Sequence, residues 1–252
     1  MRVLAVSSQV AYGPVGLTAS VPALQARGHE VLAVPTVTLS NHPGHGAPAG
    51  FRTTAADLSA IFTALENLGV LRGCAGVMTG YFASADQVQV VAGIVGRMKA
   101  ENPALYVLID PVIGDDGALY VPLAVAEAIR DQLLPLATCA TPNRFELEWL
   151  SGLRDILPAA RSLGLREVLA TSIPKDGGQL ATLLITADHC SEWFSTHKQS
   201  VPRGTGDFLA GLYLGERLRL DMAPAFRAAM TVLERAIARS AGSTVLEISH
   251  EP

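Results

Sequence analysis

The sequence has little charge and few aromatic residues for its length. Of its 252 residues, 17% are charged and 6% are aromatic, whereas 49% are hydrophobic. The 19 basic and 23 acidic residues give a net charge of −4, which argues against nucleic acid or an anionic membrane as a partner. The high apolar share also excludes an intrinsically disordered chain, and the length allows a substantial buried core.

Cysteine and long apolar runs are also scarce. Cys74, Cys139 and Cys190 are scattered and form no CxxC pair, so we expect neither a disulfide framework nor a zinc knuckle. No stretch approaches about 18 uninterrupted apolar residues, the length of a membrane span. Because the first residues also lack the pattern of a signal peptide, we expect a cytoplasmic protein.

Two common nucleotide-binding motifs are missing from the chain. No segment matches the P-loop pattern G-x-x-x-x-G-K-S/T, and no G-x-G-x-x-G follows the first apolar run. The sequence therefore predicts neither a P-loop NTPase nor a Rossmann dinucleotide site.

Short apolar runs alternate with helical patterns along the chain. The predicted strands are residues 2–7, 30–35, 73–79, 105–110, 138–141, 167–171, 180–186 and 192–195. The predicted helices are residues 15–27, 55–68, 84–100, 122–133, 143–150, 155–163, 207–218 and 223–241, with a loop over residues 36–50. This alternation predicts one α/β domain over residues 1–252, with helices on both faces of a mostly parallel sheet. The last two strands are expected to form an antiparallel hairpin around Asp188 and His189.

The strongest candidate site is the segment RGTGDFLAG, which begins at Arg203. Gly204 and Gly206 flank Thr205, and Asp207 opens an apolar helix, so several backbone N–H groups can face an anion together. Asp207 is then a candidate base for a hydroxyl that attacks a phosphoryl group. Alternatively, Asp207 only caps the helix.

Two acidic positions follow other predicted strands. Asp110 ends an apolar strand in the segment DPVIGDDG, where a carboxylate can hold Mg²⁺ directly or through water. Glu146 lies in the first turn of a predicted helix and complements Asp110 as a carboxylate linked to the metal. The alternatives are a solvated turn at Asp110 and a favourable interaction of Glu146 with the helix dipole.

Further candidate residues lie in segments that follow predicted strands. Ser8 offers a hydroxyl to a polar ligand, or is an ordinary turn serine. Tyr81 forms an apolar wall or a stacking surface, or belongs to the core. His42 and His45 have HxxH spacing, but Pro43 and the following glycine prevent the helix that a metal site would need. We expect this loop to cover a substrate instead.

Taken together, these segments resemble those of the pyridoxal kinases of the ribokinase-like superfamily. Five of them match in order over nearly the whole chain: SSQVAYGPVG, TVTLSNHPGHG, MTGYFAS, DPVIGDDG with TPNRFELEWL, and GTGDFLAG. The resemblance implies a ribokinase-like three-layer α/β/α sandwich with a central, mostly parallel sheet. It also implies that ATP phosphorylates the 5′-hydroxymethyl group of pyridoxal, pyridoxamine or pyridoxine, giving pyridoxal 5′-phosphate from pyridoxal in vitamin B6 salvage.

The resemblance also assigns roles to residues. It makes Asp207 the catalytic base, and Gly204, Thr205 and Gly206 the anion hole for the transferring phosphate. On the acceptor side it places Ser8 at the pyridine ring, Tyr81 beside the substrate and His45 in the covering loop.

The nucleotide side is assigned in the same way. Asp110 and Glu146 match acidic positions near Mg²⁺ and the phosphates, Asn143 lies beside them, and Thr186 matches a threonine near the phosphates of ATP. Gly204 is shared with this nucleotide site. The resemblance implies Mg²⁺ and ATP, with K⁺ as a further candidate cation, and a homodimer as the assembly.

The chain departs from the family in two places. Thr171, Ser172 and Ile173 stand where many relatives have Lys-His, which removes a basic group near the phosphates. The loop residues Pro43, Gly44 and His45 replace a threonine-and-tyrosine pattern, which leaves the preferred vitamer open.

Two alternative functions stay open. A hydroxymethylpyrimidine kinase of the same superfamily often carries cysteine where this chain has Asp207. A member that binds pyridoxal phosphate without catalysis would explain the missing Lys-His pair.

Overall fold

The computed structural model describes residues 1–196 and 201–248. Its strands are β1 (Arg2–Tyr12), β2 (Glu30–Asn41), β3 (Gly50–Arg52), β4 (Cys74–Thr79), β5 (Tyr106–Ile109), β6 (Gly114–Asp115), β7 (Ala118–Leu119), β8 (Cys139–Ala140), β9 (Glu167–Pro174), β10 (Gln179–Ile185) and β11 (Cys190–Thr196). Its α-helices are α1 (Leu17–Gln25), α2 (Ala55–Asn67), α3 (Ala85–Glu101), α4 (Leu123–Ala128), α5 (Arg144–Ser151), α6 (Ile156–Ser162), α7 (Thr205–Arg217) and α8 (Met222–Arg239).

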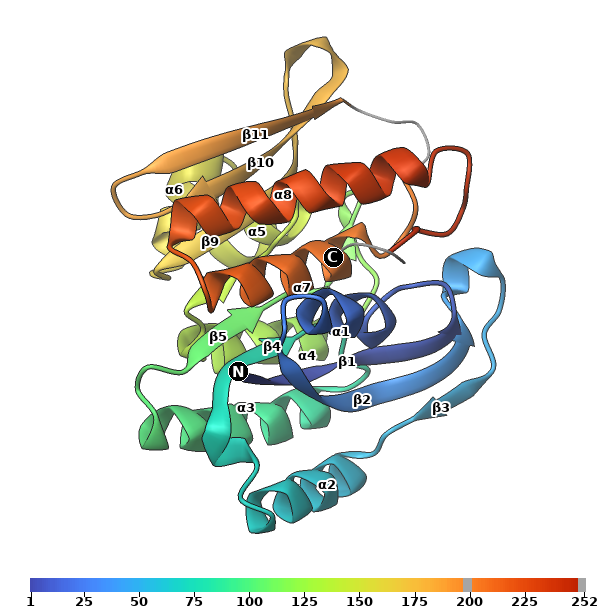
Figure 1. The fold of residues 1–252 in the computed structure, drawn as a ribbon, viewed down its shortest axis with the longest axis vertical. Coiled ribbons are helices and arrows are strands. Elements are labelled where there is room, and N and C mark those ends of the chain that lie inside the picture. The colour runs from blue at the N-terminus through green and yellow to red at the C-terminus, as the bar shows by residue number, and fades with distance from the viewer. Residues whose placement is uncertain (197–200, 249–252) are drawn as a thin grey trace.

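A nine-stranded sheet with the order β11-β10-β9-β8-β5-β4-β1-β2-β3 runs through the molecule (Figure 1). The six strands from β9 to β2 pair in parallel, whereas β10, β11 and β3 add antiparallel pairs at the two sides. The carboxyl ends of the six parallel strands therefore lie at one edge of the sheet, where α/β proteins of this kind bind ligands.

Helices cover both faces of the sheet, because side chains on successive strand residues point to opposite faces. On β1, Val3 and Ala5 pack in the core with α1, α7 and α8, whereas Leu4 and Val6 pack in the core with α2, α3 and α4. Helices α5 and α6 cover β9 and β10 on the side away from α7. The predicted three-layer sandwich with a mostly parallel sheet is confirmed.

The predicted ends of the first two strands are wrong. β1 continues to Tyr12 and β2 continues to Asn41, so residues 8–12 and much of the predicted loop 36–50 are strand. They pair with each other across a register shift between Ser7 and Gln9, and β3 covers part of the free edge of β2. The paired extensions place the turn Pro43–His45 beyond the end of the main sheet.

Two other predictions have clear outcomes. The antiparallel hairpin of β10 and β11 is confirmed, with Ile185 paired to Cys190 beside the turn. The predicted helix over residues 122–133 is interrupted: α4 ends at Ala128 and a π-helical turn, Ile129–Leu133, follows.

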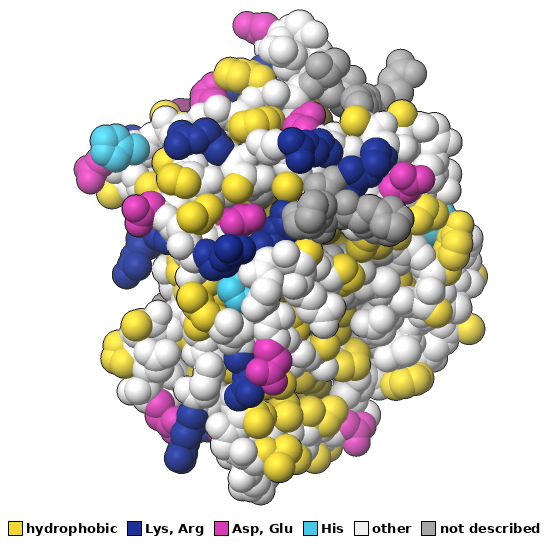
Figure 2. Space-filling view, viewed as in Figure 1, with side chains coloured by type: hydrophobic (Ala, Val, Ile, Leu, Met, Phe, Trp, Pro, Cys, Tyr) yellow, Lys and Arg dark blue, Asp and Glu magenta, His cyan; other side chains and the backbone are white. Residues whose placement is uncertain are grey.

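The surface agrees with the low net charge. Basic and acidic side chains are interspersed on the face shown in Figure 2. In the part of the chain that the structure describes, no helix combines the length and the apolar character needed to cross a membrane.

Candidate active site

The tight turn before α7 depends on glycine. Gly204 has a φ of 91°, and a Cβ atom there would collide with the carbonyl oxygen of Pro14. This left-handed residue turns the chain directly into the first turn of α7, whose leading N–H groups have no partner within the helix. The turn can therefore offer several N–H donors and the positive end of the helix dipole to an anion.

Asp207 lies in the first turn of α7, half-buried at this edge of the sheet. Its carboxylate accepts the N–H group of Gly16, and it lies 3.9 Å from the position that a Cβ on Gly80 would occupy. Burial raises the pKa of Asp207 to about 6, although the hydrogen bond from Gly16 lowers it. Asp207 is thus ionised near neutral pH and basic enough to accept a proton.

Ser8 lies beside the turn that positions Asp207. Gly16 has a φ of 58°, and a Cβ atom there would overlap the carbonyl and hydroxyl oxygens of Ser8. The close approach of Gly16 to β1 brings the Ser8 hydroxyl and the Asp207 carboxylate to the same small region.

Tyr81 is fixed by its backbone while its ring lies half-buried. Its N–H donates to the hydroxyl of Ser7 at 3.1 Å, and its carbonyl accepts the hydroxyl of Thr36 at 2.7 Å. The ring also packs against the core beneath α2 and α3. The contact with the core agrees with the structural alternative for Tyr81, and its role beside a substrate stays a prediction.

The loop beyond β2 carries His42 and His45. The Nδ1 atom of His42 accepts the N–H of Gly44 at 2.9 Å and caps the short turn Pro43–His45. The His45 ring meets the Tyr12 ring edge-on, with 5.5 Å between centroids. As expected from Pro43 and Gly44, the two histidines do not share a helix.

Acidic side chains gather at the carboxyl ends of β5 and β8. Asp110 is 7% exposed and accepts the hydroxyl of Thr141 at 2.9 Å. Burial raises its pKa well above the usual range, and the charges of Asp207 and Glu146 raise it further. No basic side chain in residues 1–196 or 201–248 forms an ion pair with these three carboxylates.

Glu146 and Asn143 form a capping box at the start of α5. The Asn143 side chain accepts the N–H of Glu146 at 2.9 Å, and Glu146 accepts the N–H of Asn143 at 2.9 Å. Glu146 also accepts the N–H of Ile113 at 2.8 Å, so it holds the loop that follows β5. Burial raises the pKa of Glu146 to about 7 even though these donors lower it.

These residues fit a cation that is held mainly by other ligands. Among the described residues, no group of three or more His, Cys, Asp or Glu side chains is arranged to hold a metal. Because Mg²⁺ in phosphoryl-transfer sites keeps waters and phosphate oxygens as ligands, one or two carboxylates are sufficient. Asp110 and Glu146, which lack a basic partner, suit that role.

The prediction for Thr186 is wrong. Strand β10 runs antiparallel to β9 and pairs Ile185 with Val168, so Thr186 lies at the opposite edge of the sheet from Asp207. Its hydroxyl accepts the N–H of His189 at 3.0 Å in the hairpin turn. The distance along the sheet keeps Thr186 away from the anion-binding turn.

Thr171 and Ser172, at the position where many relatives carry Lys-His, lie beside the turn that begins α7. Together with Thr205, Gly206 and Glu234 they line a cavity of about 130 Å³ beside the start of α7. Ser172 has a φ of 55° where β9 and β10 shift register. The sequence predicts Thr171 and Ser172 only as the replacement of a basic pair, but their position at the end of a parallel strand is a signal for a site residue.

Comparisons with known proteins agree with this geometry. A family model described as phosphomethylpyrimidine kinase matches residues 15–248. Pyridoxal kinase PdxY of Rubrobacter xylanophilus is 35% identical, with 100% of this chain and 93% of the relative covered. The pyridoxine/pyridoxal/pyridoxamine kinase of Bordetella pertussis is 36% identical, with 92% and 87% covered.

The chain is also similar to solved structures of pyridoxal kinases over most of its length. Pyridoxal kinase from Leishmania donovani in complex with ADP and pyridoxine aligns with a TM-score of 0.88 at 31% identity, over 96% of this chain and 88% of that one. Pyridoxal kinase from Entamoeba histolytica aligns with a TM-score of 0.91 at 26% identity, over 98% and 92%.

Proposed function

The chain belongs to the pyridoxal kinase family, and we propose that it transfers the γ-phosphoryl group of ATP to the 5′-hydroxymethyl group of pyridoxal or a related B6 vitamer. The single observation that carries the proposal is the pairing of Asp207 with the glycine turn at the start of α7. A base and an anion-binding turn within one helical turn are what a hydroxyl acceptor and a phosphoryl donor require.

The chemistry then follows from positions. Asp207 accepts the proton of the acceptor hydroxyl as its oxygen attacks the γ-phosphorus of ATP, the bond from that phosphorus to the oxygen bridging the β- and γ-phosphates breaks, and ADP leaves. The leading N–H groups of α7 stabilise the charge on the transferring group. Tyr81 and the loop with His45 hold the ring on the acceptor side. Asp110 and Glu146 are the carboxylates that would hold Mg²⁺, which supplies charge neutralisation at the phosphates when bound. Positioning of the reactants and neutralisation of charge account for most of the rate enhancement in such a transfer.

A pyrimidine alcohol is the second candidate acceptor. The description of the matching family model favours it, whereas Asp207 at the start of α7 and the pyridoxal kinase names of the relatives favour the B6 vitamers. Binding without catalysis is the third outcome that an assay must separate.

A coupled ADP-release assay tests these alternatives directly. Pyridoxal, pyridoxamine, pyridoxine and the pyrimidine alcohol are compared with ATP, Mg²⁺ and either K⁺ or Na⁺. We expect release with at least one B6 vitamer at a higher kcat/KM than with the pyrimidine. Vitamer binding without ADP release would instead show a silent member of the family.

The base is tested in the same assay with Asp207→Asn. Loss of the general base is expected to lower kcat by roughly 100- to 10,000-fold. Asp86→Asn is the matched control, because Asp86 is an exposed aspartate in the first turn of α3. A folded Asp207→Asn protein with full kcat would contradict the assignment. The expected homodimer stays a prediction, which light scattering of the purified protein tests.

A further inference from the structure

Arg203 is the part of the motif before α7 that the proposed chemistry does not use. Its backbone is held on both sides, since Arg203 pairs with Val245 and precedes the left-handed Gly204. Its side chain is exposed, and no carboxylate in the described ranges forms an ion pair with it. Arg203 is therefore an unpaired cation on a fixed stretch of backbone.

The guanidinium group of Arg203 lies against the loop beyond β2. A Cβ atom on Gly44 would overlap Nε of Arg203 and would lie 2.9 Å from Cζ. The same loop carries His42, whose pKa is lowered first by burial and then by the charge of Arg203. Arg203 thus links the loop over the acceptor side to the turn that begins α7.

The position of this charge is unfavourable unless an anion joins it. The first turn of a helix carries a partial positive charge, which disfavours a neighbouring cation and favours an anion. Arg203 adds a full positive charge at that turn, without a counter-ion of its own. A phosphate group at the turn would relieve both charges, and guanidinium groups bind phosphate oxygens with strong, directional hydrogen bonds.

We propose that Arg203 binds the oxygens of the terminal phosphoryl group of ATP from the side of the 42–46 loop. This inference rests on the proposed function and deepens it. Arg203 then supplies, from the helix side, the cation that the Thr171–Ser172 pair does not provide on the β9 side. It also couples the covering loop to the presence of the group that is transferred.

Nucleotide affinities distinguish this contact from a structural one. Arg203→Gln is expected to weaken AMP-PNP, which keeps a third phosphate, about tenfold or more, while ADP changes by less than about twofold. Arg203→Lys keeps a positive charge but loses the two-pronged hydrogen bonding of the guanidinium group, so its AMP-PNP affinity is expected to lie between those of wild type and Arg203→Gln. Arg166→Gln is the control, because Arg166 is exposed and lies just before β9 at the opposite edge.

Gly44→Ala provides an independent test, because it displaces the guanidinium without removing it. Gly44 lies in a short 3-10 turn, so alanine is compatible with the backbone there. We expect a weaker loss of AMP-PNP affinity than in Arg203→Gln. In the double variant, Gly44→Ala should add nothing further, since the group that it displaces is absent.

The outcomes separate this inference from the proposed function. Equal weakening of AMP-PNP and ADP, or a higher KM for the vitamer with unchanged nucleotide affinity, would assign Arg203 to general charge or to loop packing and overturn the proposal. Additive effects in the double variant would also overturn it. Failure of the wild-type protein to phosphorylate any vitamer would instead reject the proposed function, whatever the binding measurements show.

Discussion

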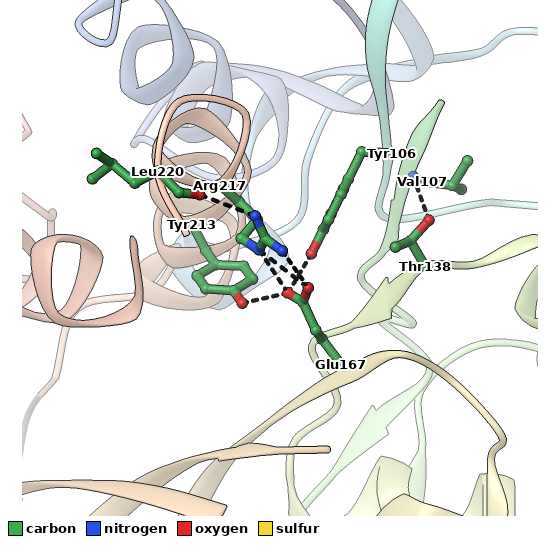
Figure 3. A network of polar contacts seen from close by, with 7 residues as sticks. All are labelled: Tyr106, Val107, Thr138, Glu167, Tyr213, Arg217 and Leu220. Carbon is green, nitrogen blue, oxygen red and sulfur yellow. Dashed lines mark hydrogen bonds and ion pairs between the residues drawn. The ribbon is translucent and has the colours of Figure 1, made fainter. Parts of the chain in front are cut away.

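Two carboxylates near the two ends of α7 have opposite surroundings: Glu167 on β9 has charged and hydroxyl partners, whereas Asp207 on α7 has no basic partner among the described side chains. Near its C-terminal end, Glu167 is fully buried and accepts Tyr106 at 2.6 Å, Tyr213 at 2.5 Å and Arg217 at 2.9 Å (Figure 3). Near its N-terminal end, Asp207 is half-buried, accepts a backbone N–H and has no basic partner among the described side chains.

This difference separates a structural carboxylate from a functional one. The donors to Glu167 include Tyr213 and Arg217 on α7 and Tyr106 on β5, so the network fixes α7 against the sheet. Asp207, Asp110 and Glu146 instead have raised pKa values, because they are buried without cations. Uncompensated charge of this kind is typical of a site that receives a cation and phosphates from solution.

The largest predicted effect on stability is at Glu167. Glu167→Gln removes an acceptor for two tyrosines and leaves Arg217 without its charge partner, so the free energy of unfolding should fall by about 3 kcal/mol. Glu30→Gln breaks an ion pair with Arg2 in which Glu30 is 62% exposed, and should cost less than about 1 kcal/mol. Urea denaturation measures both, and similar losses would mean that the Glu167 network does not anchor α7.

The two glycines of the anion-binding turn should respond differently to alanine. Gly204→Ala puts a Cβ into Pro14 and a side chain at positive φ, and should lower stability by about 1–3 kcal/mol. Gly206→Ala meets no atom within 4 Å, but Gly206 lines the cavity beside the start of α7, where the proposed function places the phosphates of ATP. It should therefore raise the KM for ATP while stability is kept. Thermal unfolding and steady-state kinetics check both; a stable Gly204→Ala protein would show that the turn is adaptable.

The remaining prediction concerns the pH dependence of stability at Asp207. Because the folded protein raises its pKa to about 6, the stability that this carboxyl contributes is complete below about pH 4 and is lost as pH rises through 6. Activity should change in the opposite direction, with kcat/KM rising through about pH 6 as the base ionises. Asp207→Asn should therefore gain a few degrees in Tm relative to wild type between pH 4 and 7; a constant difference in Tm would contradict this.

Local patterns predicted most helices and inner strands, but they missed the extension of β1 and β2. Residues 8–12 and 36–41 are compatible with a strand, yet they lie beside turn residues such as Gly13 and Pro43 and carry many polar side chains. Their strand structure depends on each other, since Gln9 pairs with Thr38 and Tyr12 with Asn41. A single-chain pattern does not reveal such a partner.

The candidate site shows the same limit. The sequence placed Asp110, Asn143 and Glu146 near one another, because each lies where a parallel strand ends or shortly after it. It placed Asp207 with them only through the resemblance of the motif before α7, since the preceding strand, β11, is antiparallel. It misplaced Thr186, which also ends a strand, because the direction of β10 is set by its antiparallel pairing with β9.

The sequence by itself determined the order of strands and helices, the α/β class and the chemical character of the turn before α7. These properties depend on the periodicity of apolar residues and on residue types that act within a few positions. The tertiary structure alone decided which edge each strand end reaches, which carboxylates are paired, and that Arg203 lies against Gly44. Those properties depend on contacts between segments far apart in the chain, which form only when the strands pair and the helices pack.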